Sequence, residues 1–293
     1  MSWKMYRWVW QVKSPIHIGW APSGALNRTK LYIPARTIWG AFTAEIARRR
    51  ANNSFPNYDS VGAELQKNIR FTYLYPAEKI NGNWSAWLPS YKLNGFTSEL
   101  PVWNNEEESK KYLSHRKFKK ILLASLPSTA INPKTFSADE STLREIEVIK
   151  QYWKENGLDD NQVSFVGYVF IRDEGLKNEV FTINELFIGA DTRYGFGGVV
   201  RKEDPLLQDK CFGKEVKLDA VNPVVKADTI LGHVKANSRG GFNFSGSVEL
   251  VQQWDKEKIL ISGLAWMPGS FTSEEKEFVI LQNGFWDINS EKG

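Results

Sequence analysis

The sequence predicts an α+β fold, in which antiparallel strands are combined with a small number of helices. Residues 3–12 alternate, with Trp8, Trp10 and Val12 on the opposite face from Arg7, Val9 and Gln11, which predicts a half-buried strand. Residues 37–50 carry apolar side chains at four-residue spacing, which is typical of an amphipathic helix. Two further alternating runs, 242–254 and 258–266, predict strands near the C-terminus. This succession favours an α+β fold over a doubly wound parallel sheet.

The composition is that of a globular protein. The 293 residues are 42% hydrophobic and 25% charged, and this length is near the point at which one core divides into two domains. The single cysteine, Cys211, excludes an internal disulfide and a cysteine-rich metal site, which fits a reducing cytosol. No signal-peptide pattern and no run of about 18 apolar residues occurs, so we expect a cytoplasmic protein without membrane contact. The net charge of +4 favours a polyanionic partner only weakly.

The first strand is expected to lead through a loop into the helix. Residues 14–24 hold two prolines and two glycines, which indicate a turn-rich loop. Thr37 is the expected N-cap of the helix. The run Arg48–Arg50 ends the helix, where cations interact favourably with the helix dipole.

The middle of the chain is expected to have little regular structure. Residues 51–107 place short aromatic stretches between Asn, Gly and Pro. Residues 110–120 carry six Lys or Arg residues and no acid, so they form either a solvated face or a flexible arm against phosphates. Residues 128–149 are expected to extend as an arm that leads into a strand, although the apolar spacing at their end also fits a helix.

Regular structure is expected again from residue 163 onward. Residues 163–171 form an almost continuous apolar run, which predicts a buried strand. Residues 179–189 predict a short helix that ends at a glycine-rich loop. After residue 202 the pattern changes to alternating strands, so residues 203–293 are expected to form a second, smaller unit.

The glycine-rich loop, residues 189–202, combines four glycines with basic and aromatic side chains. Its glycine spacing fits neither a P-loop nor a dinucleotide-binding fingerprint. A concave turn of backbone N–H groups can bind phosphate oxygens, with Arg193 and Arg201 adding charge. Tyr194 or Phe196 can stack on a base. The structural alternative is a hairpin or helix end in which glycine serves only the backbone conformation.

The three histidines have no spacing that links them as metal ligands. His17 lies between two isoleucines and is either a proton-transfer group of a ribonuclease or a packed residue. His115 falls in the basic run and His233 in the second unit. The residues therefore predict no metal site, no catalytic constellation and no small-molecule cofactor.

Several motifs resemble those of one family. The pattern SPIHIG…YIPARTIWGAFTAEI resembles the N-terminal signature of the RAMP superfamily of CRISPR effector complexes, and GADTRYGFGGV is similar to the glycine-rich loop of that superfamily. Residues 128–143 resemble its projecting arm. SRGGFNFS and MPGSFTS resemble C-terminal stretches of the end-capping subunit of type III complexes, which holds the 5′ tag of the guide RNA (crRNA). Ala35 and Pro268 depart from the family pattern, which has Gly and Glu there.

The resemblance implies two ferredoxin-like (RRM-like) modules. The first spans residues 1–202, with an insertion around 51–142, and the second is the smaller β-rich unit 203–293. The implied partners are crRNA, the large signalling subunit and the first backbone subunit, in a prokaryotic cytoplasm. Position in the motifs and in the basic run gives these candidate RNA-binding residues: Lys13, His17, Arg36, Arg116, Lys117, Arg193, Tyr194, Gly195, Phe196, Gly197, Gly198, Arg201 and Arg239.

The functional classes of subunit in this superfamily require different residues. Subunits that slice the target carry an aspartate in the loop after the first strand, and residues 19–32 contain no Asp or Glu. We therefore expect a subunit that binds without cutting. Three alternatives stay open: a metal-independent guide-processing endoribonuclease that uses His17, a backbone subunit of the same complex, and a scaffold that contacts only proteins.

Overall fold

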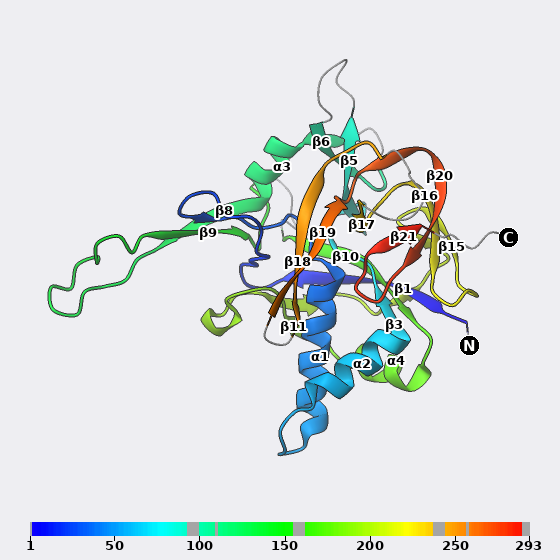
Figure 1. Ribbon diagram of the computed structural model, residues 1–293, viewed down its shortest axis with the longest axis horizontal. Coiled ribbons are helices and arrows are strands. Elements are labelled where there is room, and N and C mark those ends of the chain that lie inside the picture. Colours follow the sequence, from blue (N-terminus) through cyan, green and yellow to red (C-terminus); the bar gives the residue numbers. More distant parts are fainter. Residues whose placement is uncertain are drawn as a thin grey trace.

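The centre of the protein is an antiparallel sheet built around β1 (Lys4–Val12) and β10 (Ser164–Ile171), as the computed structural model shows (Figure 1). The two strands pair along their length, from Lys4 opposite Ile171 to Gln11 opposite Ser164. Every residue of β10 is buried, because both faces of this strand are covered, which explains its continuous apolar run. The structure describes residues 2–92, 100–108, 111–154, 162–236, 244–255 and 258–288.

Around these two strands the sheet runs in the order β11-β12-β1-β10-β4-β5-β6-β7, with β3 also paired to β10. The chain is therefore a strand-rich α+β protein, as the sequence predicts. The remaining strands of this sheet are β3 (Ile69–Phe71), β4 (Tyr75–Ile80), β5 (Asn83–Lys92), β6 (Leu100–Asn105), β7 (Tyr112–Ser114), β11 (Glu185–Phe187), β12 (Gly198–Arg201) and β13 (Leu206–Leu207).

Helix α1 (Ala35–Ala51) packs against this sheet, together with α2 (Tyr58–Asn68) and α4 (Glu174–Phe181). The predicted amphipathic helix is confirmed: Phe42 lies in the core and stacks on Trp8 with ring centroids 5.3 Å apart. The predicted N-cap, Thr37, is wrong. The helix begins two residues earlier, after Pro34, which has no side-chain oxygen to cap it. No helix in the described parts of the chain is long and apolar enough to cross a membrane.

The prediction of irregular structure over residues 51–107 is wrong, because this segment contains α2 and the strands β3 to β6. The signal is present in the sequence. Asn81 and Gly82 both have positive φ and join β4 to β5 in a tight hairpin, and Asn-Gly is the commonest pair for such a turn. Residues 115–120 of the basic run lie in α3 (His115–Leu122) and are therefore not part of a flexible arm.

A two-stranded arm projects from the body (Figure 1). It consists of β8 (Leu123–Ser128) and β9 (Arg144–Ile149), with the short β2 (Leu26–Asn27) paired parallel to β9 at its base. The expected arm and its return strand are confirmed, and the helical alternative is wrong. The expected helix over 179–189 is wrong in its bounds, because α4 ends at Phe181 and β11 then joins the sheet.

In the described residues after β13 we find strands and no helix. One sheet has the order β14-β15-β16-β20-β21 and another β17-β19-β18. Both units contribute to a single buried core, and β13 pairs with β1 across the expected boundary at residue 203. The strands are β14 (Lys210–Cys211), β15 (Lys214–Lys217), β16 (Val224–Thr229), β17 (Val234–Lys235), β18 (Val248–Asp255), β19 (Lys258–Trp266), β20 (Phe271–Ile280) and β21 (Trp286–Ile288).

Candidate nucleic-acid interface

The glycine-rich loop packs tightly against its own chain. Gly197 has φ +80°, and a Cβ at this position would lie 2.1 Å from the carbonyl oxygen of Ile188. Its N–H donates to the carbonyl of Pro15 at 2.8 Å, and its own carbonyl accepts from the Ile188 N–H at 2.8 Å. Glycine is needed here because another part of the same chain approaches the backbone closely.

Gly198 is buried in the same way. Its N–H donates to Ser14 Oγ at 2.8 Å, and its carbonyl accepts from the Lys13 N–H at 2.8 Å. The prediction that the main chain at Gly197 and Gly198 is open to a phosphate backbone is therefore wrong. Their amides already have partners within the protein, so they cannot form a phosphate cradle.

The tip of the loop is exposed, and it consists of the short 3₁₀ turn η1 (Thr192–Tyr194) and Gly195. The side chain of Tyr194 is 81% exposed, and Arg193 is exposed beside it. Gly195 has φ +84° with open space around its Cα, so glycine serves the turn conformation at this position. Arg193, Tyr194 and Gly195 thus remain accessible for an external ligand, while Phe196 is half-buried.

The side chain of Arg201 is buried and bonds within the protein. Its side chain is 7% exposed, and its guanidinium donates to the carbonyl of Ile183 at 3.2 Å. Burial lowers the pKa of this guanidinium, and the exposed Asp204 carboxylate partly offsets that effect. Arg201 therefore ties β12 to the chain before β11.

A cleft of ≈ 990 Å³ lies beside the loop, lined by His17, Arg36, Gly189 and Ala190 among others. Residues Glu249 to Gln252 of β18 also line the cleft. The structure thus brings His17 and Arg36 to one cavity next to the glycine-rich loop. Lys13 is exposed at the loop's base, and Arg239 lies outside the described residues.

His17 is buried but reaches the cleft. Its Nδ1 donates to the carbonyl oxygen of Glu147 at 2.8 Å. Because a carbonyl can only accept, this contact sets the tautomer of the neutral imidazole, with the proton on Nδ1 and the lone pair on Nε2. The imidazole is therefore held in one orientation by the arm.

Sequence reasoning missed a buried polar network in the wall of the cleft. Glu249 Oε1 contacts His233 Nε2 at 2.5 Å and Lys30 Nζ at 2.6 Å. Its Oε2 accepts from the indole N–H of Trp20 at 2.8 Å. The hydroxyl of Tyr73 lies 2.6 Å from His233 Nδ1. Burial lowers the pKa of His233, which favours the neutral imidazole, and in that form Nδ1 accepts from the Tyr73 hydroxyl while Nε2–H points at the carboxylate. No local pattern signals this network, because its members come from opposite ends of the chain.

Burial and charge act in opposite directions on this network. Burial raises the pKa of Glu249, but the hydrogen bond from His233 and the charge of Lys30 outweigh it and lower that pKa to about 2. Burial lowers the pKa values of His233 and Lys30, and Glu249 offsets part of each shift. The network therefore contains a carboxylate, an ammonium and a neutral imidazole at neutral pH.

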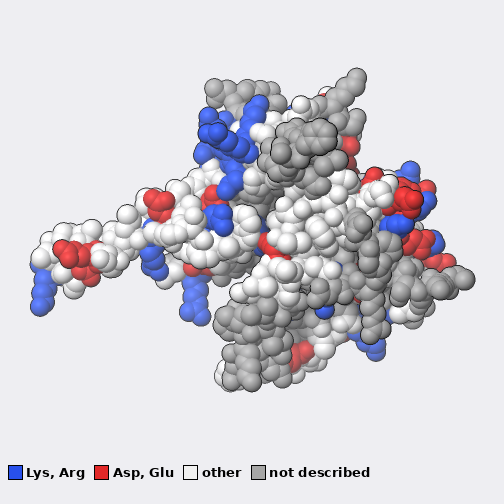
Figure 2. All heavy atoms as spheres, turned by 45° about the horizontal axis from the view of Figure 1, so that its top comes forward, with Lys and Arg blue, Asp and Glu red and all other residues white. Residues whose placement is uncertain are grey.

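Basic side chains gather at a second place. Figure 2 shows a group of Lys and Arg atoms close to where the arm leaves the body. Arg116 and Lys117 are both exposed on α3, and Arg116 lines a pocket there that is distinct from the cleft. In the described parts of the chain no three His, Cys, Asp or Glu residues come close enough together to hold a metal ion.

The chain is similar to known proteins in sequence pattern and in fold. The model of the RAMP superfamily matches residues 11–200, which include the end of β1, helix α1, the arm and the glycine-rich loop up to Val200. A chain of the type III-B Cmr-beta bound to cognate target RNA and AMPPnP has a TM-score of 0.52 at 13% identity, and the alignment covers 91% of this chain and 85% of that one. This likeness is one of fold.

A second solved chain, from the type III-B Cmr-beta bound to cognate target RNA, has a TM-score of 0.39 at 9% identity. That alignment covers 68% of this chain and 96% of the other. No curated protein sequence matches this chain.

Proposed function

Because this chain belongs to the RAMP superfamily, we propose that it is a non-catalytic crRNA-binding subunit of a type III CRISPR effector complex. In this role it holds the 5′ tag of the guide RNA and docks the large signalling subunit and the first backbone subunit. The family match over residues 11–200 is the observation that carries the proposal. The structural neighbour in an RNA-bound Cmr-beta supports an RNA ligand.

The arrangement of the first sheet supports the proposed module structure. The strand order β12-β1-β10-β4, with α1 after β1 and α4 after β10, supports a ferredoxin-like module. We propose that residues 1–202 form this module with the insertion at 51–142, and that residues 203–293 form the smaller second unit. Both units contribute side chains to the same buried core.

The exposed turn beside the cleft supplies what an RNA contact requires. Arg193 can bind a phosphate, and Tyr194 offers an exposed ring on which a base can stack. Lys13 and Arg36 add positive charge at the base of the loop and in the cleft. Such a surface binds through phosphates for affinity and needs no catalytic group.

Arg193→Glu is expected to weaken binding of a labelled crRNA by about 5- to 30-fold, which corresponds to about 1–2 kcal/mol. The reason is that a phosphate contact is replaced by a repulsive charge. Filter-binding titrations at two salt concentrations measure this effect. The matched control is Lys67→Glu, which makes the same change of charge at an exposed position of α2 outside the cleft. Equal affinities of the two variants would contradict the proposed contact.

The 5′-tag role has its own test. The chain is co-purified with the products of its neighbouring genes, and the bound RNA is sequenced. We expect guide RNAs that share one 5′ tag, and a reconstituted complex that loses affinity when the tag is replaced but not when the spacer is replaced. If replacing the tag and replacing the spacer change the affinity equally, the chain does not hold the 5′ tag.

One observation favours a second candidate, the guide-processing endoribonuclease. His17 borders the cleft, and its Nε2 has the lone pair that a general base needs. The other cleft imidazole, His233, has both nitrogens in hydrogen bonds, so it is not available as a partner acid.

We therefore expect His17→Ala to leave the processing of a precursor guide RNA unchanged. The measurement is incubation of the purified chain, wild type and variant, with end-labelled precursor RNA, with Thr29→Ala as a control for local packing, because Thr29 hydrogen-bonds the neighbouring Ile18. Cleavage by the wild type that is lost in His17→Ala and kept in Thr29→Ala would establish the endoribonuclease instead.

A further inference from the structure

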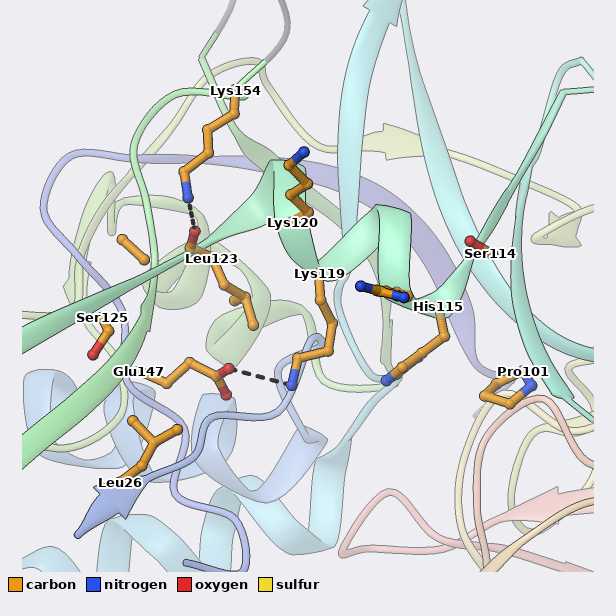
Figure 3. Close-up of a pocket in the computed structure, with 12 residues that line it drawn as sticks. Leu26, Pro101, Ser114, His115, Lys119, Lys120, Leu123, Ser125, Glu147 and Lys154 are labelled. Atoms are coloured by element: carbon orange, nitrogen blue, oxygen red, sulfur yellow. Dashed lines mark hydrogen bonds and ion pairs between the residues drawn. The ribbon is translucent and has the colours of Figure 1, made fainter. Parts of the chain in front are cut away.

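A pocket of ≈ 730 Å³ lies between α3 and the base of the arm, and we call it the α3 pocket (Figure 3). Its cationic side chains are Arg116, Lys119, Lys120 and Lys154, and its lining includes one carboxylate, Glu147. The pocket is separate from the cleft, with which it shares no lining residue. Its size is in the range of pockets that bind small organic molecules.

The single carboxylate is already occupied. Glu147 Oε1 lies 3.2 Å from Lys119 Nζ, and Oε2 accepts from the backbone N–H of Thr29 at 3.0 Å. The Nζ of Lys154 donates to the carbonyl of Leu123 at 2.6 Å, and this neutral acceptor does not cancel the charge of the ammonium (Figure 3). Within the described residues, Arg116, Lys120 and Lys154 therefore have no carboxylate partner. Three such cations around one cavity create a positive potential that attracts an anion.

The packing of α3 holds these charges in place. Phe118 is fully buried and stacks on Trp103 with ring centroids 4.3 Å apart. Ile121 and Leu122 are buried with it. Because residues three and four apart share a helix face, Arg116 and Lys120 project together on the side away from Phe118. Arg116 and Lys120 are thus presented by a helix that is anchored in the core, and Lys154 comes from the segment after β9.

His115 contributes a hydrogen-bond donor to the pocket. The indole N–H of Trp103 donates to His115 Nδ1 at 3.3 Å, so the neutral imidazole carries its proton on Nε2. Burial, and then the charge of Lys119, lower the pKa of His115, which favours this neutral form. The floor adds apolar surface from Leu26 and Leu123.

We propose that the α3 pocket holds one unstacked nucleotide of a single-stranded RNA. The phosphate lies against Arg116, Lys120 and Lys154, and the base lies on the apolar floor beside His115. This combination of cations around an apolar slot is what recognition of a splayed nucleotide requires. The inference rests on the proposed function, because it assigns a second contact site to the same RNA.

The test measures the fluorescence anisotropy of a 5′-labelled crRNA titrated with the full chain. Arg116→Glu and Lys120→Glu are each expected to weaken binding by about 5- to 30-fold, whereas the control Lys67→Glu stays within about 2-fold of the wild type. Lys120→Gln is expected to make the slope of log K against log salt shallower by about 0.7, the value for one contact to single-stranded RNA.

A steric variant tests whether the nucleotide enters the pocket. Ala124 lies on strand β8 and lines the cavity, so Ala124→Trp fills the space without altering its charge. We expect Ala124→Trp to weaken binding by about 10-fold, with an unchanged melting temperature as evidence of folding. If the charge variants weaken binding and Ala124→Trp does not, the RNA crosses the rim only, and the proposal is overturned.

The outcomes also separate this inference from the proposed function. If the wild-type chain binds no RNA, either alone or in the reconstituted complex, both the proposed function and the α3 pocket assignment are overturned. If the wild type binds RNA and Arg193→Glu weakens it, while Arg116→Glu and Lys120→Glu behave like Lys67→Glu, only the α3 pocket assignment falls.

Discussion

Gly197→Ala is expected to lower the melting temperature of this chain by about 8–16 °C, the shift that corresponds to about 4 kcal/mol of unfolding free energy. The cause is twofold. A non-glycine residue at φ +80° costs about 1–2 kcal/mol. In addition, the new Cβ would lie 2.1 Å from the Ile188 carbonyl oxygen, so the hydrogen-bonded backbone must shift. Thermal unfolding followed by circular dichroism measures the change.

Gly195→Ala is the matched control for this prediction. Gly195 has nearly the same φ, +84°, but no atom lies within 4 Å of the position that its new methyl group would take. It should therefore show only the conformational cost of about 1–2 kcal/mol. The difference between the two variants isolates the close approach of Ile188 to the loop. Equal melting temperatures for both would show that the loop is not packed as described.

Glu249→Gln is expected to destabilise the chain by about 3–5 kcal/mol at neutral pH, because it leaves the buried ammonium of Lys30 without its counter-charge. The amide has nearly the same shape as the carboxylate, so the loss comes from charge and not from a cavity. Urea unfolding at neutral pH measures the effect. The control is Glu274→Gln, which alters an exposed ion pair with Lys276 and should cause no measurable change.

The same network predicts a pH dependence. The folded-state pKa of Glu249 is about 2, below its ordinary value of 4.5. The stabilisation from its carboxylate is therefore fully present above about pH 4.5 and is lost as the pH falls from there toward 2. The lowered pKa of His233 acts in the same direction from about pH 6.5 downward, because the unfolded chain then binds the additional proton.

The gap in unfolding free energy between the wild type and Glu249→Gln should thus be largest near neutral pH and should narrow between about pH 4.5 and 2. Urea unfolding of both proteins across this range tests the sign. A gap that stays constant as the pH falls would mean that the ionised carboxylate is not the source of the stabilisation.

The sequence by itself determined those parts of the fold that rest on local periodicity. Alternating side chains identified β1 as a strand, and four-residue spacing identified α1. The prediction that β1 is half-buried is wrong, because residues 8–12 are buried on both faces. An uninterrupted apolar run identified β10. The short motifs were also local, and they led to the family that the match over residues 11–200 shows. The hairpin of β4 and β5 was equally predictable from Asn81-Gly82 and was overlooked.

The tertiary structure alone decided how the functional surfaces are built. Gly197 looked free to approach a ligand, but Ile188 and Pro15 fill that space. The network joins Lys30 to Glu249, which are separated by 219 positions in the chain. The α3 pocket requires the basic helix to meet the base of the arm. Such contacts depend on how distant segments pack, and the period of one segment carries no information about its distant neighbours.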